Sequence, residues 1–255
     1  MSLAAVLIVH NEEANLAACL ASVRDWVDEI VILDSGSTDS TAAIAAEFGA
    51  QYAVEPVWPG YGRQRQLAQA RVRSDWCLWL DADERVTPAL RASIEAVVAQ
   101  PVGRTVYSVP RLNWLFGRHI RHCGWYPDRV LRLYPTGLTR YNDALVHEKV
   151  EVSADMRVQP LDGDLLHYPY RDLEHYLSKS ARYAKAWADG RAARGKRTSL
   201  LAGFGHALGC FARMYLLKAG FLDGRAGLLI SLLSAHSTFV KYADLWLRSQ
   251  PSRPE

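Results

Sequence analysis

The first eighty residues alternate between short apolar runs and stretches with helical spacing, and this order limits the fold more than any other feature. The apolar runs are typical of buried parallel strands, and the stretches between them place apolar side chains three and four residues apart, as amphipathic helices do. The predicted strands cover residues 3–9, 29–33, 51–54 and 76–80, and the predicted helices cover residues 12–27, 41–48 and 62–72. A β-α-β-α-β-α-β order predicts an α/β domain with a parallel sheet and right-handed crossover connections.

The chain beyond residue 85 follows a different pattern. A helix is expected over residues 86–100, with Pro88 near its start. Strands are expected over residues 105–112, 130–134, 146–152 and 165–168, and they would extend the sheet in antiparallel fashion. A further helix is expected over residues 171–194. The sequence therefore predicts a mostly parallel α/β domain over residues 1–170 and a helical region over residues 171–255.

The net charge of +3 is unevenly distributed along the chain. Residues 1–170 hold 16 Lys and Arg against 21 Asp and Glu, a net of −5, whereas residues 171–255 hold 14 against 6, a net of +8. The basic region contains two uncharged segments of fifteen residues each, 198–212 and 226–240, which we expect to form a helical hairpin. Each is shorter than the roughly 20 apolar residues that a bilayer-spanning helix needs.

The surroundings of these two segments indicate a membrane surface as a partner. Apolar helices with basic flanks are typical of in-plane attachment to anionic lipid. The alternative is a hairpin packed on the rest of the chain or on a second subunit, as in a homo-oligomer. Nucleic acid is not expected, because the basic residues are interleaved with long apolar segments. The N-terminus has no signal-peptide pattern, and the four cysteines are widely spaced. We therefore expect a cytoplasmic location at a membrane surface.

Acidic residues follow three of the predicted parallel strands. Glu12 comes after the first strand, Asp34 ends the second, and Asp81 and Asp83 follow the fourth. Ligands of open α/β sheets bind outside the carboxyl ends of the strands, and two carboxylates two residues apart can share a divalent cation that also binds a diphosphate. The sequence lacks GxGxxG after the first strand and has no Walker A motif. A dinucleotide-binding domain is therefore excluded.

The segments VLIVHNEEANL, EIVILDSGSTDST and WCLWLDADE together resemble family 2 inverting glycosyltransferases of the GT-A fold. Later segments, among them RLNWLFGRHIRHCGWYPDRVLRLY, ALVHEKV and LLHYPY, are similar to the lipopolysaccharide-core β-1,4-glucosyltransferase subgroup. The resemblance implies a GT-A Rossmann-like sheet and transfer of a hexose, most often glucose from UDP-glucose. The implied acceptor is a lipid-linked inner-core saccharide, such as a heptose on lipid A, which would place the enzyme at the cytoplasmic face of the inner membrane.

The resemblance also assigns roles to residues. Asp34 would accept a hydrogen bond from the uracil N3–H, Val9 would pack on the base, and His10 and Glu12 would line the uridine site. Arg63 would approach the nucleotide or its phosphates. Asp83 would bind Mg²⁺ or Mn²⁺ directly, Asp81 would contact the ribose or bind the metal through water, and His167 would be a third metal ligand. Surface or structural roles remain the alternatives for Glu12, Arg63 and His167.

An inverting transfer needs a carboxylate that removes the proton of the acceptor hydroxyl. The family places this base downstream of the DxD motif, and two residues fit, Glu148 in VHEKV and Asp128 in WYPDR. The Glu-Asp dipeptide that is common in the family is missing here. The structural alternative for Asp128 is an ion pair with Arg129 or Arg132, and for Glu148 it is pairing with His147 or Lys149.

Other functions compete with this interpretation. A different UDP-sugar transferase of the cell envelope would carry the same motifs. A nucleotidyltransferase also uses an acidic metal site, but it normally has a glycine- and lysine-rich phosphate loop after the first strand, which HNEEANL is not. A non-catalytic membrane-binding module would need only the basic C-terminal region.

Overall fold

The computed structural model describes residues 1–145 and 148–250 and contains two compact units. The first, which we call the sheet unit, comprises Met1–Arg111 and Asp128–His167. The second, the helix unit, comprises Leu112–Pro127 and Tyr168–Glu255. The segment 112–127 thus belongs with the C-terminal helices, although the sequence analysis groups it with the sheet.

The sheet unit begins with four parallel strands in the spatial order β3-β2-β1-β4. They are β1 (Leu3–Val9), β2 (Glu29–Asp34), β3 (Gln51–Val54) and β4 (Trp76–Trp79). The central strand β1 is buried on both faces, and its side chains alternate between two hydrophobic clusters. This burial explains its unbroken apolar sequence. The predicted parallel half of the sheet is confirmed.

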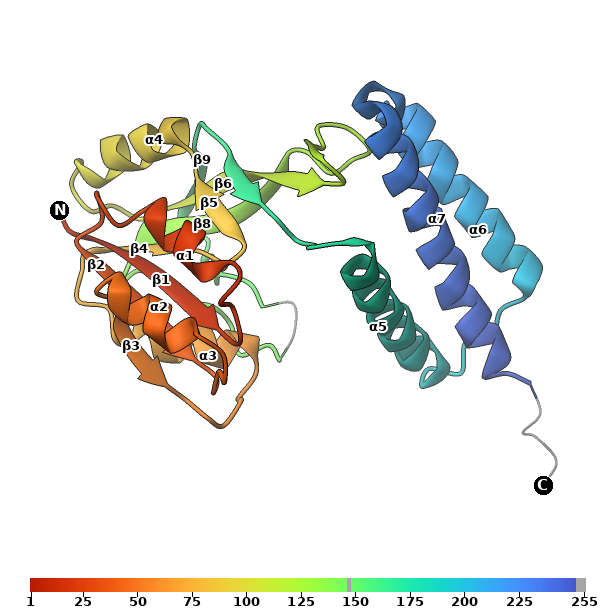
Figure 1. Cartoon of the computed structure of the whole chain (residues 1–255), viewed down its shortest axis with the longest axis horizontal. Coiled ribbons are helices and arrows are strands. Elements are labelled where there is room, and N and C mark those ends of the chain that lie inside the picture. Colours follow the sequence, from red (N-terminus) through yellow and green to blue (C-terminus); the bar gives the residue numbers. More distant parts are fainter. Residues whose placement is uncertain (146–147, 251–255) are drawn as a thin grey trace. The chain divides into compact units, whose positions relative to one another are not determined.

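Four helices connect and cover these strands (Figure 1). They are α1 (Leu16–Ala21), α2 (Thr41–Glu47), α3 (Tyr61–Gln69) and α4 (Pro88–Val98). Helices α1, α2 and α4 contribute to the cluster on one face of the sheet, and α3 contributes to the cluster on the other. The start of α4 follows from its sequence, because the Thr87 hydroxyl accepts a hydrogen bond from Leu90 N at 3.3 Å and Pro88 occupies the first turn.

Helix α1 is much shorter than the predicted span of residues 12–27. The main-chain N–H groups of Asn11, Glu12 and Glu13 donate to side chains of the loop after β2 rather than to a helix. Asn11 also has a φ of 54°, which a helix does not allow. The apolar spacing predicted a helix from residue 12. Hydrogen bonds to the side chains of Ser37, Asp39 and Thr41 instead hold residues 11–13 in a non-helical conformation.

The sheet continues in the order β4-β8-β6-β10-β5, with β4–β8, β8–β6 and β10–β5 antiparallel. The strands are β5 (Glu84–Val86), β6 (Thr105–Leu115), β8 (Asp128–Pro135) and β10 (Leu165–His167), and β9 (Arg157–Pro160) pairs in parallel with β6. The predicted antiparallel extension is confirmed. No strand forms over the described part of 146–152, where one isolated bridge joins Tyr141 and Val150, and Val146 and His147 lie outside the described residues.

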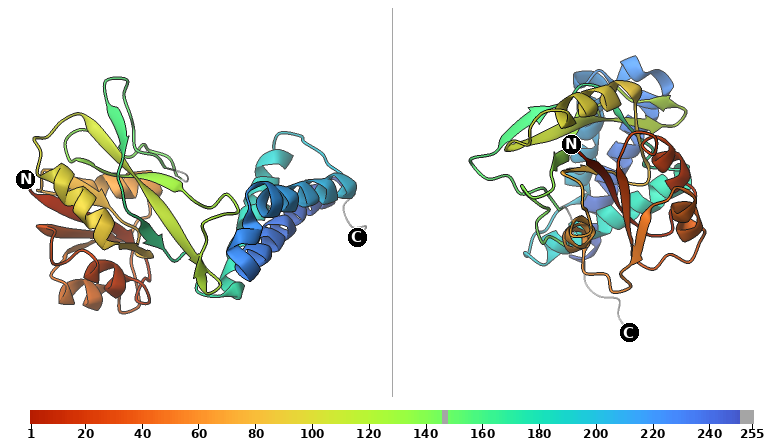
Figure 2. Two further views of the ribbon diagram at one scale, coloured as in Figure 1. Left: turned by 90° about the horizontal axis from the view of Figure 1, so that it is seen from above. Right: turned by 90° about the vertical axis from the view of Figure 1, so that its left-hand side faces the viewer.

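The helix unit holds the short strand β7 (Arg118–His119) and three long helices. These are α5 (Leu173–Ala192), α6 (Leu200–Ala212) and α7 (Gly224–Leu247), and α7 packs against both α5 and α6 (Figures 1 and 2). Asp172 caps α5 and Ser199 caps α6 by accepting main-chain hydrogen bonds. The predicted C-terminal helical hairpin is therefore present as α6 and α7.

The turn between α6 and α7 lengthens the first apolar helix beyond its predicted end. Helix α6 continues without a break into the π-helical turn Arg213–Leu217, and a 3₁₀ turn, Gly220–Asp223, precedes α7. The resulting helical segment Leu200–Leu217 has 18 residues. By length and composition it is long and apolar enough to cross a membrane, so the expectation that this segment is too short is wrong.

Candidate active site

The loops that follow β1 and β2 are hydrogen-bonded to each other at the carboxyl edge of the sheet. Asn11 N donates to Ser37 Oγ at 2.7 Å, and Thr38 N donates back to Asn11 Oδ1 at 2.9 Å. Val9 ends β1 opposite Asp34 and is buried, whereas the adjacent His10 is exposed. The two loops therefore form one rigid surface at the edge where ligands of α/β sheets bind.

Asp34 is completely buried and organises this surface. Its Oδ1 accepts hydrogen bonds from Gly36 N and Ser37 N, both at 2.6 Å, and its Oδ2 accepts one from the Tyr52 hydroxyl at 2.6 Å. Burial and this hydrogen bond raise the pKa of Tyr52. Oδ2 keeps one further acceptor position beside the Tyr52 contact.

Asp81, the first carboxylate of the DxD motif, lies between two buried arginines. Its Oδ1 accepts from Arg65 Nη2 at 2.7 Å, and its Oδ2 accepts from Arg132 Nη2. Burial alone would raise the pKa of Asp81, but the charges of Arg132 and Arg65 lower it by more, so that the pKa lies well below its usual range. Both oxygens of Asp81 thus face guanidinium groups, which occupy the positions that a metal ion would need.

Glu84 completes this charge cluster beneath the motif. It is fully buried, its Oε1 accepts from Arg132 Nη2 at 2.6 Å, and its Oε2 accepts from Asp81 N at 3.0 Å. Burial raises the pKa of Glu84, although the charge of Arg132 opposes the rise. Because Arg132 is shared by both carboxylates, the DxD turn is fixed to β8 by charged hydrogen bonds.

Arg65 connects Asp81 to Glu148, one of the two predicted bases. Its Nε donates to Glu148 Oε1 at 3.0 Å, and its guanidinium lies over the rings of Trp79 and Tyr141 at 5.2 and 4.8 Å. The Arg65 side chain is 5% exposed and that of Glu148 is 15% exposed. Glu148 is therefore held near the DxD motif by a buried arginine that also pairs with Asp81.

A glycine makes this connection possible. A Cβ atom on Gly62 would lie 1.9 Å from the main-chain oxygen of Asn142. The close approach lets Gly62 N donate to Ala144 O at 3.1 Å and Tyr61 N donate to Leu145 O at 3.2 Å. The start of α3 and the loop that leads to Glu148 thus pack backbone to backbone.

Asp83, the second carboxylate of the motif, faces His167. His167 pairs with Glu84 in the β10–β5 register, and its Nε2 lies 3.4 Å from Asp83 Oδ2. Within the described residues, no three Asp, Glu, His or Cys side chains converge as a metal-binding group. A carboxylate and an imidazole nevertheless fit a Mg²⁺ or Mn²⁺ ion that takes its other ligands from a diphosphate and water.

The remaining predicted residues have these positions. Glu12 lies near the motif, since burial, followed by the charges of Asp83 and Asp81, raises its pKa, and Asn15 donates to its Oε2. Arg63 is exposed and its Nη1 donates to Gln66 at 2.9 Å. Asp128 is 42% exposed and accepts from Arg111 Nε at 2.9 Å. Within the described residues Asp128 pairs with Arg111 and Glu148 with Arg65, and His147, one of the partners expected for Glu148, lies outside them.

Sequence reasoning missed Arg65, Arg132 and Tyr52. A signal existed for Arg132, because it interrupts the apolar strand VLRLY at a position whose neighbours are buried. Helix α3 buries polar side chains, Gln64, Arg65 and Gln66, and so has no apolar stripe to reveal its inward face. Arg65 Nη1, Arg132 Nε and both amide atoms of Gln64 are buried without a hydrogen-bond partner among the residues that the structure describes. These groups leave hydrogen-bonding capacity around the cluster.

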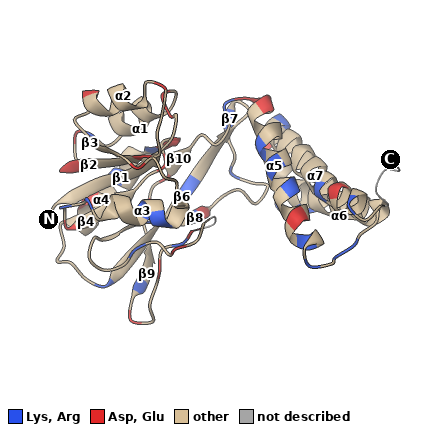
Figure 3. Cartoon of the chain, turned by 90° about the horizontal axis from the view of Figure 1, so that it is seen from below, with Lys and Arg blue, Asp and Glu red and all other residues tan. Residues whose placement is uncertain are grey.

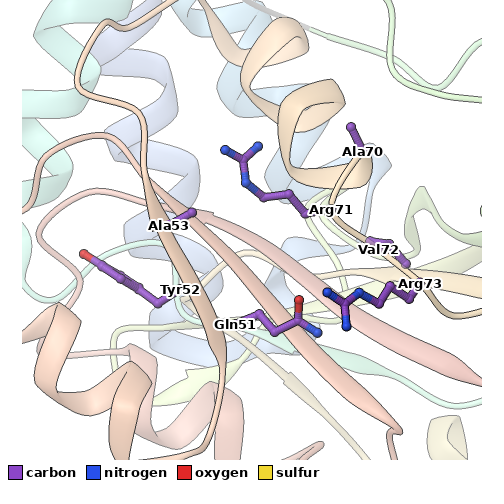
Figure 4. Close-up of a pocket in the computed structure, with 7 residues that line it drawn as sticks. All are labelled: Gln51, Tyr52, Ala53, Ala70, Arg71, Val72 and Arg73. Atoms are coloured by element: carbon purple, nitrogen blue, oxygen red, sulfur yellow. The ribbon is translucent and has the colours of Figure 1, made fainter.

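A separate hollow lies between β3 and the end of α3 (Figure 4). Its volume is about 410 Å³, and it is lined by Gln51, Tyr52, Ala53, Ala70, Arg71, Val72 and Arg73. In the close-up, the Tyr52 ring points away from Arg73. Apart from Tyr52, this hollow contains none of the residues of the acidic cluster, so it is not the candidate site.

Comparisons with known proteins agree with this picture. The sequence profile described as Glycosyl transferase family 2 matches residues 4–162. The chain is 30% identical to the lipopolysaccharide core biosynthesis glycosyltransferase LpsC of Rhizobium meliloti, over 99% of this chain and 96% of that protein. It is 27% identical to the uncharacterized glycosyltransferase RP128 of Rickettsia prowazekii, over 96% and 87%.

Among solved structures, glucosyl-3-phosphoglycerate synthase from Mycobacterium tuberculosis, in complex with Mn²⁺ and uridine-diphosphate-glucose, is 26% identical to this chain. The likeness has a TM-score of 0.37 and covers 44% of this chain and 43% of that chain.

Proposed function

Because the chain belongs to glycosyl transferase family 2, we propose that it transfers glucose from UDP-glucose to a lipid-linked inner-core lipopolysaccharide acceptor with inversion of the anomeric configuration. The observation that carries the proposal is the cluster at the carboxyl edge of the sheet, where Asp83 and His167 face each other and Arg65 holds Glu148 beside Asp81. The similarity to LpsC over nearly the whole chain supports a role in lipopolysaccharide core biosynthesis, and the acceptor that we propose is a lipid-A-linked heptose.

Asp83 and His167 are the proposed direct ligands of a divalent cation, Mg²⁺ or Mn²⁺. When bound, such an ion neutralises the charge that develops on the leaving UDP. Asp81 contributes differently in this proposal, because Arg65 and Arg132 already occupy its oxygens. It orients the two guanidinium groups toward the donor site, and any contact it makes with the metal or the ribose passes through water.

Glu148 is the proposed general base. It removes the proton of the acceptor hydroxyl as that oxygen attacks the anomeric carbon from the face opposite UDP. Its charged hydrogen bond with the buried Arg65 orients the carboxylate. Asp128 is the second candidate, but it is more exposed and its Oδ2 accepts two hydrogen bonds from Arg111.

The nucleotide contacts follow the residues at the ends of β1 and β2. Val9, His10 and Glu12 are proposed to line the uridine site together with Asp34, and the exposed Arg63 is proposed to approach the phosphates. Opening of the Tyr52 contact would free Asp34 Oδ2 for the uracil N3–H.

The enzyme is proposed to act at the cytoplasmic face of the inner membrane, where a lipid-linked acceptor would be found. The excess of 14 Lys and Arg over 6 Asp and Glu after residue 170 favours an anionic surface as a partner. A second copy of the chain is the alternative partner for the apolar helices.

Isothermal titration of UDP and UDP-glucose, with and without Mn²⁺, tests the donor site on the wild type and on Asp83→Ala. We expect metal-dependent binding that Asp83→Ala abolishes. The matched control is Asp155→Ala, which removes an exposed aspartate that pairs with Arg104 and should bind as the wild type does. Absence of UDP binding to the wild type under both conditions would reject the mechanism.

Competition in the same titration tests the finer assignments. UDP-galactose and UDP-N-acetylglucosamine should displace UDP-glucose poorly if glucose is the transferred sugar. Equal displacement by either sugar nucleotide would favour another cell-envelope transferase with the same fold.

A further inference from the structure

Helix α6 exposes a stripe of large apolar side chains. Leu201, Phe204 and Leu208 are 80%, 61% and 59% exposed, and their spacing of three and four residues places them on one side of the helix. The exposed apolar surface continues into the next turns with Leu216 and Leu217. We call Leu201, Phe204, Leu208, Leu216 and Leu217 the α6 stripe.

The described residues of the helix unit do not cover this stripe, because α6 contacts α7 through a different side. Gly203 is the buried residue of α6, and a Cβ atom there would lie 3.0 Å from Tyr242 Cβ on α7. Gly205 and Gly209 have no neighbouring atoms within 4 Å of a Cβ position. Helix α6 itself carries no charged residue, so its ribbon is tan throughout (Figure 3). A helix without charges that exposes several large apolar side chains is unusual against water.

The charges around the stripe are of one sign. Between residues 194 and 222 the chain contains five basic residues and no acidic one, and all five are exposed: Arg194, Lys196, Arg197, Arg213 and Lys218. Three of them precede α6 and two lie in the turns that follow it. Cations at both ends of an apolar helix match a layer of anionic headgroups when the helix lies parallel to that layer.

The turn between α6 and α7 determines how the hairpin can meet a bilayer. Asp223 in this turn is 1% exposed and accepts hydrogen bonds from Arg121 N and His122 N, and from Arg118 through its main-chain oxygen. A hairpin inserted tip first would carry this buried carboxylate and the polar segment 118–122 into hydrocarbon, which is strongly unfavourable. An orientation in the plane of the membrane leaves them at the headgroups.

We propose that the α6 stripe is a membrane-binding surface that enters the headgroup region of an anionic bilayer, with the α6 axis parallel to the surface. Leu201, Phe204 and Leu208 reach the acyl boundary, while the basic residues at the two ends of the helix contact lipid phosphates. The proposal specifies which residues would bind the membrane, and only the biological purpose of that binding rests on the proposed function. Lipid binding itself needs neither the sugar donor nor the metal.

Vesicle flotation of the full chain tests the surface, with phosphatidylcholine vesicles prepared with and without phosphatidylglycerol. The variant Leu201→Gln/Phe204→Gln/Leu208→Gln keeps good helix formers at each position. The matched control, Val57→Gln/Val102→Gln/Val158→Gln, removes three exposed apolar side chains from the sheet unit. We expect the wild type and the control to float with the anionic vesicles. We expect the stripe variant to bind at least about tenfold more weakly, and salt to weaken the wild type.

Undiminished flotation of the stripe variant would overturn the proposal. A second result would also overturn it: the wild type fails to float, and analytical ultracentrifugation shows that it is a dimer whereas the stripe variant is a monomer. The stripe would then bind a second copy of the chain. Tight, salt-independent binding to neutral vesicles that resists carbonate extraction would indicate a spanning helix instead. UDP titration of the stripe variant separates the two proposals, since donor binding should be retained.

Discussion

The two units of this protein distribute charge and apolar surface in opposite ways. In the sheet unit, charged side chains such as Arg65, Arg132 and Glu84 are buried and paired at the edge of the sheet. In the helix unit, charges are mostly exposed, and so are large apolar side chains such as Leu201 and Phe204. Buried pairs fix the positions of groups that act on a substrate, whereas several exposed apolar side chains on one side of a helix indicate a partner or a membrane.

One pair of arginines offers the strongest test of this contrast. Arg132 pairs with Asp81 and Glu84 and is 4% exposed, whereas Arg248 of the helix unit pairs with Asp189 and Asp244 and is 30% exposed. Arg132→Gln removes the cation that Asp81 and Glu84 share, so that Asp81 keeps only Arg65 and the buried Glu84 keeps only the more distant Arg111. It should lower the free energy of unfolding by about 3–5 kcal/mol. Urea denaturation, with hydrogen exchange to follow each unit separately, measures the change.

Arg248→Gln is the control for this comparison. Solvent screens exposed ion pairs, so its unfolding midpoint should equal that of the wild type within error. Equal destabilisation by both variants would mean that burial does not distinguish the two arginines, and the contrast between the units would fail.

The second prediction separates the two candidate bases within the sheet unit. Glu148→Gln keeps the shape of the side chain but removes the proton acceptor, and it should lower kcat by about 10²–10⁴-fold with UDP binding unchanged. Asp128→Asn alters an exposed pair with Arg111 and should lower kcat less than about tenfold. Sugar-transfer assays and UDP titration of both variants provide the measurement. A greater loss in Asp128→Asn would transfer the role of base to Asp128.

The third prediction concerns two tyrosines, one from each unit. Tyr52 donates its hydroxyl to the buried Asp34, whereas Tyr183 on α5 is 58% exposed. Tyr52→Phe removes a hydrogen bond to a buried carboxylate and should cost about 1.5–3 kcal/mol of stability. Tyr183→Phe should change stability by less than about 0.5 kcal/mol. Thermal or urea unfolding of the two variants compares them directly, and a silent Tyr52→Phe would show that Asp34 does not need the contact.

The fold could be predicted much more fully than the site. Apolar runs predicted the parallel strands. For example, β1 is buried on both faces, and its sequence is apolar at every position. Helical spacing also predicted that α1 begins at residue 12, which is wrong because Asn11, Glu12 and Glu13 bond to the next loop. Contacts of that kind join residues more than 25 positions apart, and they cannot be predicted from the spacing of apolar residues within a short segment.

Long-range ion pairs set the same limit at the site. Asp81, Asp83 and Glu148 stand out in the sequence as acids near strand ends or in a recognisable motif, and the structure brings them to one region through Arg65 and His167. Arg65 lies 83 residues from Glu148. The Arg65 side chain points inward because Gly62 lets the start of α3 pack closely against the loop around Asn142. The sequence alone therefore could not identify Arg65 as the residue that connects Asp81 and Glu148.

The smallest expected effect is a change in the free energy of unfolding when one glutamate in each unit is replaced, and its sign is opposite in the two units. Burial raises the pKa of Glu12, and the nearby Asp83 and Asp81 add to the rise. A raised pKa means that folding favours the protonated form. The contribution of Glu12 to stability is therefore fully present only below the ordinary pKa of a glutamate, about 4.3. It is lost as the pH increases through the raised pKa of the folded state.

Glu12→Gln should accordingly be slightly more stable than the wild type at pH 8, by well under about 1 kcal/mol because solvent screens the partly exposed carboxylate, and this advantage should vanish near pH 4. Glu174 occupies the first turn of α5 and is exposed, so Glu174→Gln should destabilise by a few tenths of a kcal/mol at pH 8 through loss of a helix-dipole interaction. Urea midpoints of both variants at the two pH values measure the signs. A Glu12→Gln variant that is less stable than the wild type at pH 8 would mean that the fold needs this carboxylate charged, which contradicts the direction of its pKa shift.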